Sequence, residues 1–335
     1  MTNKKLIRWI IYIAGLFLIV MAIGLICLSI GPTFIPIKDI IAALKSGKSS
    51  INYDIIFDIR LPRIILGFAV GGALSLAGVI LQGMFKNPLV EPYTLGISGG
   101  GALGVCLGIV LGLIQKIGYI SLPLCGFSGA ILVILLVYFL SIKKGILKIQ
   151  GLLLTGVMIS FISSSLIMLV MAVSNVTNLQ GIIFWTMGSL EQPHWLLIKT
   201  MVFISLIGLF VSYLFSVNLN AFSLGEEEAH HLGVDTERTK KFLFILSSLL
   251  TGVAVSVSGI IGFVGLAVPH FVRRFVGSDH RILLASSFLC GAGFLIICDT
   301  IARTIIAPME LPVGVITGIL GGSLFVYFLS KKPSI

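Results

Sequence analysis

The sequence is poor in charged residues. Only 11% of its 335 residues are Asp, Glu, Lys or Arg, against about a quarter in soluble domains, and 57% are hydrophobic. So few charges cannot cover a water-exposed surface, which excludes an ordinary soluble domain. The net charge of +10 does not indicate a nucleic-acid partner, because the basic residues gather at the ends of apolar runs.

Cysteine and histidine are also scarce, with five of each. The cysteines are scattered and form no CxxC or Cys/His cluster, so we expect neither disulfides nor a structural metal. His230 and His231 are adjacent and point to different faces of a helix, which disfavours metal ligation. No nucleophile and base stand at a suitable spacing. We therefore expect no catalytic residue and no metal or cofactor bound by this chain.

One short motif partly matches a phosphate-binding loop. Gly47-Lys48-Ser49 would need a glycine five residues before Gly47, and that position is Ala42. No strand pattern precedes the motif. We therefore do not expect this chain to bind ATP.

Apolar runs of about 20 residues recur along the chain, the length that a helix needs to cross a bilayer. The short alternating segments of a β-barrel are absent. We predict an all-α polytopic membrane protein with about ten transmembrane helices in a single domain, residues 1–335. The eighth span is short and contains Pro269, which favours a broken or incomplete helix. The predicted spans are residues 8–30, 62–83, 94–113, 119–141, 150–173, 194–216, 240–260, 263–276, 281–302 and 312–330.

The distribution of basic residues predicts the orientation. With the N-terminus inside, fifteen of the 23 Lys and Arg fall on the inner side and eight on the outer side, as the positive-inside rule requires. Both termini are then cytoplasmic. The polar stretch 218–241 holds five of the thirteen acidic residues and lies on the inner side. It is too short for a domain, so we interpret it as a docking element for a motor protein.

A weak internal repeat occurs at an offset of 181 residues. Its two copies would pair the second and third spans with the seventh and eighth, and these run in opposite directions across the membrane. Transporters are commonly built from such inverted halves. The matching positions are Gly71, Ala73, Ser75, Gly78, Pro88 and Gly96 with Gly252, Ala254, Ser256, Gly259, Pro269 and Gly277.

Asp299 and Arg303 stand four residues apart in the ninth span. A lone charge inside a membrane is costly, so we expect a structural ion pair. An ion-coupled secondary carrier, the alternative class of transporter, would need an acidic residue near mid-membrane. Asp299 is the only candidate, and its pairing argues against that class.

Arg60 and Arg63 share one helix face on the outer side. They are either interfacial arginines whose heads reach water or a docking site for another protein. Asp58 is predicted to cap the helix that they begin, with Pro62 in its first turn.

Several longer motifs resemble the FecCD family, the permeases of ATP-driven importers for iron–siderophore, haem and cobalamin, and the match covers nearly the whole chain in order. In the first half these are Arg60-Leu61-Pro62-Arg63, Gly78-Val79-Ile80-Leu81-Gln82 and Asn87-Pro88-Leu89-Val90-Glu91-Pro92. In the second half these are Gly259-Ile260-Ile261-Gly262-Phe263-Val264-Gly265-Leu266, Val268-Pro269-His270, Asp279-His280-Arg281, Asp299-Thr300-Ile301-Ala302-Arg303 and Glu310-Leu311-Pro312-Val313-Gly314.

The resemblance implies a ten-span permease with the type II ABC importer fold. It implies a homodimer, occasionally a heterodimer, with two cytoplasmic ATPase subunits beneath it and an external substrate-binding protein above it. ATP and Mg²⁺ would be used by the ATPase and not by this chain. The cargo would be an iron(III)–siderophore or a related metal chelate, the commonest assignment in the family, with haem or cobalamin as the alternative.

The resemblance also implies roles for particular residues. The ATPase-coupling residues would be Gly225, Glu226, Ala229, Leu232 and Gly233. The residues that present positive charge to the binding protein would be Arg60, Arg63 and Arg303. The inner end of the translocation path would be narrowed by Asn87, Pro88 and Leu89.

Overall fold

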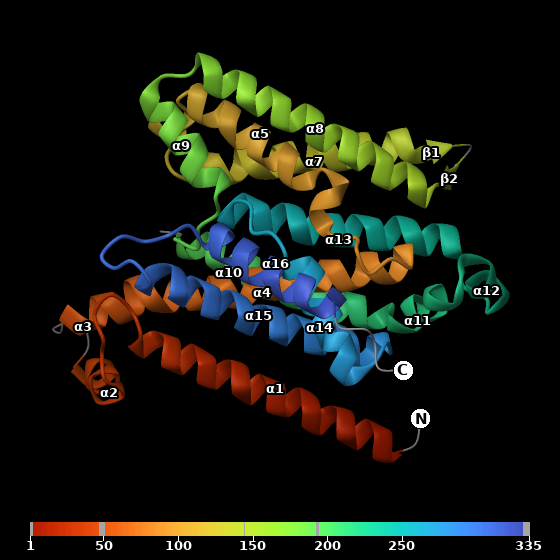
Figure 1. Cartoon of the computed structure of the whole chain (residues 1–335), viewed down its shortest axis with the longest axis horizontal. Coiled ribbons are helices and arrows are strands. Elements are labelled where there is room, and N and C mark those ends of the chain that lie inside the picture. Colours follow the sequence, from red (N-terminus) through yellow and green to blue (C-terminus); the bar gives the residue numbers. More distant parts are fainter. Residues whose placement is uncertain (1–2, 47–50, 144, 192–193, 331–335) are drawn as a thin grey trace.

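The computed structural model describes residues 3–46, 51–143, 145–191 and 194–330, which form a helical bundle (Figure 1). Gly47-Lys48-Ser49 therefore lies outside the described residues. The helices are α1 (Asn3–Ser29), α2 (Ile37–Ser46), α3 (Ile51–Asp54), α4 (Leu61–Phe85), α5 (Ile97–Val110), α6 (Leu113–Ile117), α7 (Ser121–Ser141), α8 (Ile149–Val173), α9 (Val176–Thr186), α10 (Trp195–Leu214), α11 (Ser216–Leu224), α12 (Glu226–His231), α13 (Thr236–Ser258), α14 (Val264–Val276), α15 (His280–Thr304) and α16 (Val313–Ser330). The described residues also contain a π-helical turn (Ile55–Arg60) and a 3-10 turn (Pro92–Leu95). Two strands of two residues each, β1 (Ile142–Lys143) and β2 (Ile146–Leu147), form a hairpin.

Each of the ten predicted spans coincides with one helix. Among the described residues, seven helices are long and apolar enough to cross a membrane. α5 and α16 are shorter apolar helices, and α14 has only 13 residues. The short helices α2, α6, α9 and α11 were not predicted individually, because a few turns leave little periodic signal.

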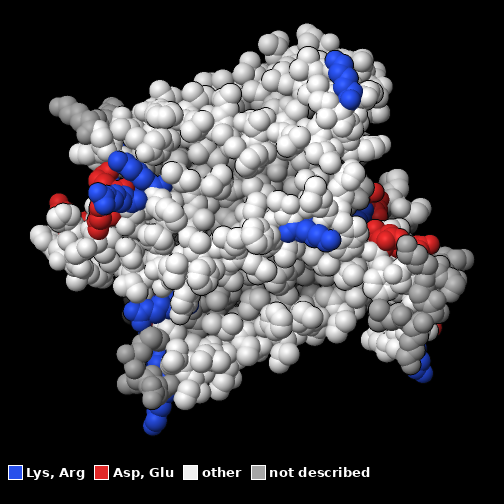
Figure 2. Space-filling model, turned by 180° about the vertical axis from the view of Figure 1, so that it is seen from behind, with Lys and Arg blue, Asp and Glu red and all other residues white. Residues whose placement is uncertain are grey.

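The bundle has two ends. We call the end with α12, the β1–β2 hairpin and the start of α1 the α12 end, and the opposite end, with α2 and α9, the α9 end (Figure 1). Seen from behind, charged side chains gather toward the margins of the molecule and its middle is largely uncharged (Figure 2). This distribution is expected of a protein whose middle lies in lipid.

α4 is the central helix of the bundle, with α10, α13, α14 and α15 packed around it. In its most apolar stretch 83% of the residues are buried, against 11% for α1 and for α8, which lie outermost. Close packing around α4 needs glycine. A Cβ on Gly78 would lie 1.9 Å from the carbonyl oxygen of Gly265 in α14, and one on Gly71 would lie 2.3 Å from that of Gly291 in α15.

The packing of the helices has the pattern of an inverted repeat. α4 packs on α15 and α14, as α13 packs on α7 and α5. The group α5, α7 and α8 is mutually packed, as is the group α14, α15 and α16. α4 runs toward the α12 end and α13 runs away from it (Figure 1). The first half, from α4 to α8, and the second half, from α13 to α16, therefore have corresponding helix contacts and opposite directions.

The constant offset of 181 is nevertheless wrong beyond α4 and α13. Pro88 lies in the connection after α4, whereas Pro269 lies inside α14. Gly96 precedes α5, whereas Gly277 ends α14. The reason is that residues 86–96 connect α4 to α5, while only residues 259–263 connect α13 to α14.

Two local predictions are corrected. Asp58 caps no helix, because the π-helical turn that contains it continues directly into α4.

α14 is not broken at Pro269. A proline in a helix leaves the carbonyl four residues earlier without its usual donor. Here that carbonyl belongs to Gly265, and Gln82 Nε2 donates to it at 3.2 Å.

Candidate functional site

The polar stretch 218–241 folds into α11, α12 and the start of α13 at the α12 end. Gly225 separates α11 from α12 with φ 148°, and Gly233 ends the next turn with φ 85°, both in the region that favours glycine. Asp235 then caps α13 by accepting a hydrogen bond from Arg238 N at 3.1 Å. Two glycines and a cap thus define a short, independent helix between two longer ones.

A small apolar cluster holds α12 against α11. Ala229 is fully buried and packs with Ala221 and Phe222 of α11, and Val234 covers the group. Of the predicted ATPase-coupling residues, Ala229 therefore faces inward. Leu232 faces outward, 64% exposed, and Leu224 at the other side of α12 is 62% exposed. Leu224 and Leu232 thus place two exposed apolar side chains on an otherwise polar element.

A buried lysine joins α12 to its neighbours. Lys240 of α13 is 2% exposed, and its Nζ lies 2.6 Å from Glu226 Oε1 and pairs with Glu237. It also donates to the carbonyl of Leu147 in β2 at 3.2 Å, and Leu147 N donates to Glu237 at 2.9 Å. Glu226 therefore has a structural role within the triple glutamate. The sequence signal for this cluster was the Glu237–Lys240 spacing, which the prediction did not use.

A second connection runs from α11 to α15. Asn220 Nδ2 donates to Asp279 at 2.9 Å, and Asn220 Oδ1 accepts from His280 N at 2.8 Å. Burial raises the pKa of Asp279, but hydrogen bonds from Asn220 and from Arg281 N outweigh it and hold this pKa below its ordinary value. Asp279 is therefore favoured as a carboxylate, the form that accepts both bonds.

The predicted inner part of the path lies beside α12. Asn87 Oδ1 accepts a hydrogen bond from Leu89 N at 2.9 Å, which makes a tight turn through Pro88, and Leu89 is 54% exposed. Lys86 ends α4 in the left-handed region, with φ 50°, and donates to the carbonyl of Leu224 at 2.9 Å. Lys86, which the sequence did not single out, thus connects the 87–89 turn to the residue before Gly225.

The three arginines predicted to bind another protein are not brought together on one exposed surface. Arg60 is 2% exposed and donates to the carbonyl oxygens of Leu28, at 2.7 Å, and Ser29, at 3.1 Å, at the end of α1. Arg303 is equally buried and its Nε lies 2.9 Å from Asp299. The docking role of these residues stays a prediction.

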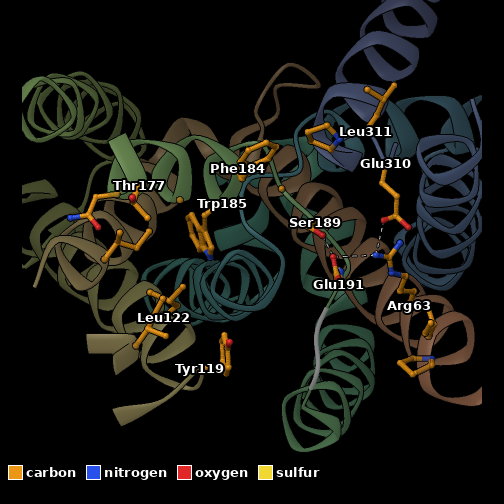
Figure 3. A pocket seen from close by; sticks show the side chains of 18 of the residues that line it. Arg63, Tyr119, Leu122, Thr177, Phe184, Trp185, Ser189, Glu191, Glu310 and Leu311 are labelled. Atoms are coloured by element: carbon orange, nitrogen blue, oxygen red, sulfur yellow. Dashed lines mark hydrogen bonds and ion pairs between the residues drawn. The ribbon is translucent and has the colours of Figure 1, made fainter. Parts of the chain in front are cut away.

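Arg63 differs from the other two because it borders an open cavity. Its guanidinium lies 2.8 Å from Glu310 and 3.4 Å from Glu191, which come from the connections before α16 and after α9. Both glutamates are partly exposed. This ion pair joins the start of α4 to two loops at the α9 end (Figure 3).

The cavity has a volume of about 890 Å³ and lies between α4, α9, the start of α7 and the connection before α16. Its aromatic side chains Tyr119, Phe184 and Trp185 lie on one side, and Arg63, Glu191 and Glu310 lie on the other (Figure 3). A smaller cavity of about 160 Å³ shares Trp185 and Glu191 and extends toward the end of α13. The prediction missed the aromatic residues, because the cavity forms only when distant segments meet.

Comparison with known proteins gives a match over almost the whole chain. The model of the FecCD transport family matches residues 17–331. The hemin transport system permease protein of Yersinia pestis is 40% identical over 82% of this chain and 83% of its own length. The cobalamin import system permease protein of Halobacterium salinarum is 38% identical over 87% and 77%. A probable siderophore transport system permease protein of Bacillus subtilis is 36% identical over 96% and 95%.

A solved structure has the same fold. It is described as an inward-facing conformation of a metal-chelate type ABC transporter, and it superposes with a TM-score of 0.85 at 31% identity. The superposition covers 96% of this chain and 99% of that one. The all-helical fold of type II importer permeases therefore extends over the full bundle.

Proposed function

The chain belongs to the FecCD transport family and is a permease of an ABC importer, and we propose that it carries an iron(III)–siderophore or a related metal chelate across the cytoplasmic membrane. The relatives' names include hemin and cobalamin, which are large metal chelates, and siderophore, a ligand whose ferric complex is one. Haem and cobalamin remain the alternative cargoes.

The observation that carries the ATP-driven part of this proposal is the exposed α12 element with its internal connections, whereas the class of cargo is proposed from the relatives. Leu224 and Leu232 offer apolar contacts to an ATPase, and the glycines on either side let α12 move as a unit. ATP and Mg²⁺ would be bound by two such ATPase subunits, and this chain would supply no catalytic group.

The connections suggest how a displacement of α12 would reach the path. Lys86 would transmit it to the 87–89 turn, Asn220 to α15, and Lys240 to α13 and the hairpin. Each connection uses a charged or amide side chain on a main-chain or carboxylate partner. Rigid helices joined in this way move as bodies.

In this assembly the α12 end faces the cytoplasm, as the excess of basic residues at that end favours, and both termini lie there. A second copy of the chain completes the path, and an external binding protein delivers the chelate at the α9 end. Among the three predicted docking arginines, Arg63 is the one that lines the large cavity.

Replacing Leu232 with Asp tests whether α12 binds the ATPase. A carboxylate cannot enter an apolar cleft without a partner, so we expect the ATPase to be lost from the purified complex. Leu111→Asp is the matched control: Leu111 is 60% exposed but lies at the α9 end, and this variant should keep the ATPase. Copurification of the ATPase with both variants would contradict the coupling role of α12.

Different results would favour an enzyme, an ion-coupled carrier or another cargo. ATP hydrolysis by the isolated chain would argue against a permease that lacks catalysis. Uptake that survives ATP depletion and stops with an ionophore would favour an ion-coupled carrier. The chelate that the purified binding protein retains would decide between siderophore, haem and cobalamin.

A further inference from the structure

The charged lining of the large cavity is opposite in sign to the chain as a whole. The chain has a net charge of +10, yet the cavity is lined by three carboxylates and one guanidinium, a formal charge of −2. The guanidinium of Arg63 lies closest to Glu310. Asp58 and Glu191 are both exposed, Glu191 with 75% of its side chain open to solvent. The adjoining smaller cavity adds no further charged residue to this lining.

The opposite wall also favours positive charge. Tyr119, Phe184 and Trp185 lie on the side of the cavity opposite Arg63 and Glu310 (Figure 3). The faces of aromatic rings attract cations and repel anions. Gln115 and Asn178 supply neutral polar groups to the same lining. Both walls of the cavity thus favour a cationic ligand over an anionic one.

We propose that this cavity selects chelates by charge: it admits a metal chelate whose net charge is zero or positive and disfavours a polyanionic one. The inference rests on the proposed function and specifies the class of its cargo. A cavity whose lining has a net charge concentrates ions of the opposite sign and lowers the local concentration of ions of its own sign. A ferric trishydroxamate with a free ammonium group fits this chemistry, and a trianionic ferric triscatecholate does not.

The test compares these two ferric chelates in proteoliposomes that contain the complete transporter and its binding protein. The ratio of their uptake efficiencies (kcat/KM, cationic over trianionic) is measured for the wild type and for Asp58→Asn/Glu191→Gln. The double variant removes two negative charges and leaves the Arg63–Glu310 pair in place. We expect the ratio to fall about tenfold, the scale for removing two charges some 10 Å from the cargo in a partly aqueous site.

Asp54→Asn is the matched control. Asp54 is exposed, lies four residues before Asp58 and does not line the cavity, so the loss of this one charge should leave the ratio nearly unchanged. Because the binding protein has its own preference, binding of each chelate to the permease–ATPase complex is also measured without it, by quenching of tryptophan fluorescence. Trp185 in the cavity wall reports on the bound ferric ion.

An unchanged ratio in the double variant, or an equal change in Asp54→Asn, would overturn the inference. So would tighter wild-type binding of the trianionic chelate without the binding protein. If the double variant does not assemble, binding of both chelates to the wild type is measured at increasing salt concentration. The preference for the cationic chelate should shrink as the charges are screened. A preference that does not change with salt would contradict the inference. If neither chelate enters in an ATP-dependent manner, the proposed function fails, and this inference fails with it.

Discussion

Arg60 is the residue whose surroundings differ most from what its sequence position suggested. Arg60 has no acidic partner among the described residues. Its guanidinium instead donates hydrogen bonds to main-chain carbonyl oxygens at the C-terminus of α1 and in the turn that follows. These are the carbonyls that a helix leaves without an intrahelical donor. A Cβ at Gly31 would lie 2.5 Å from this guanidinium, so the turn after α1 is shaped around it.

Arg60→Met should therefore lower the stability of the isolated permease. The change leaves the α1 carbonyls without their donor, and we expect a loss of about 1–3 kcal/mol, measured as a lower Tm in detergent. Arg238→Met is the control, because its side chain is 90% exposed and its pair with Asp235 contributes little. Equal Tm values for Arg60→Met and the wild type would show that this capping is unimportant.

At the scale of elements, the contact between α4 and α14 depends on the absence of side chains. Gly78 of α4 lies directly against the carbonyl of Gly265, and Gln82, one turn later, bonds to the same carbonyl. The helices can approach closely only because Gly78 has no Cβ. This contact lies between the two inverted halves, so a wider spacing would disturb both.

Gly78→Ala should separate the two helices. The new methyl group would overlap a main-chain oxygen that cannot move alone, so we expect destabilisation of about 1–3 kcal/mol or more. Gly15→Ala in α1 is the matched control, because nothing lies within 4 Å of a Cβ there. It should be neutral or slightly stabilising, since alanine favours a helix. Similar Tm values for the two variants in detergent would contradict close packing at Gly78.

At the scale of the whole molecule, two outer helices are equally unburied but differ in polarity. α1 exposes mainly large apolar side chains, as expected of a helix in lipid. α8 also exposes Ser164 and Ser165 near its middle. A polar face there suits a second copy of the chain with a hydrated path between the two.

Cysteine accessibility tests this difference. Ser164→Cys should react with a water-soluble thiol reagent in the assembled transporter, because a thiolate forms only where water reaches it. Leu18→Cys, at a 68% exposed position in the middle of α1, should not react. Both reactions are compared with the wild type, whose five cysteines set the background. Labelling of Leu18→Cys but not of Ser164→Cys would reverse the assignment of lipid and path.

Much of this architecture follows from local pattern. Apolar runs in the sequence located the ten helices, because a segment in lipid must satisfy its own main-chain hydrogen bonds. The polarity of residues 218–241 marked the exposed element, and the spacing of Asp299 and Arg303 predicted the ion pair that the structure contains.

Tertiary structure alone decided what those residues meet. The 218–241 stretch was recognisable by its charge, but only the fold places Lys86, Asn220 and Lys240 as its three connections. The cavity likewise joins Asp58, Trp185 and Glu310, which are more than a hundred residues apart in sequence. The physical reason is that periodicity and composition act over a few turns of one helix, whereas a cavity or an ion pair between elements depends on how separate helices pack.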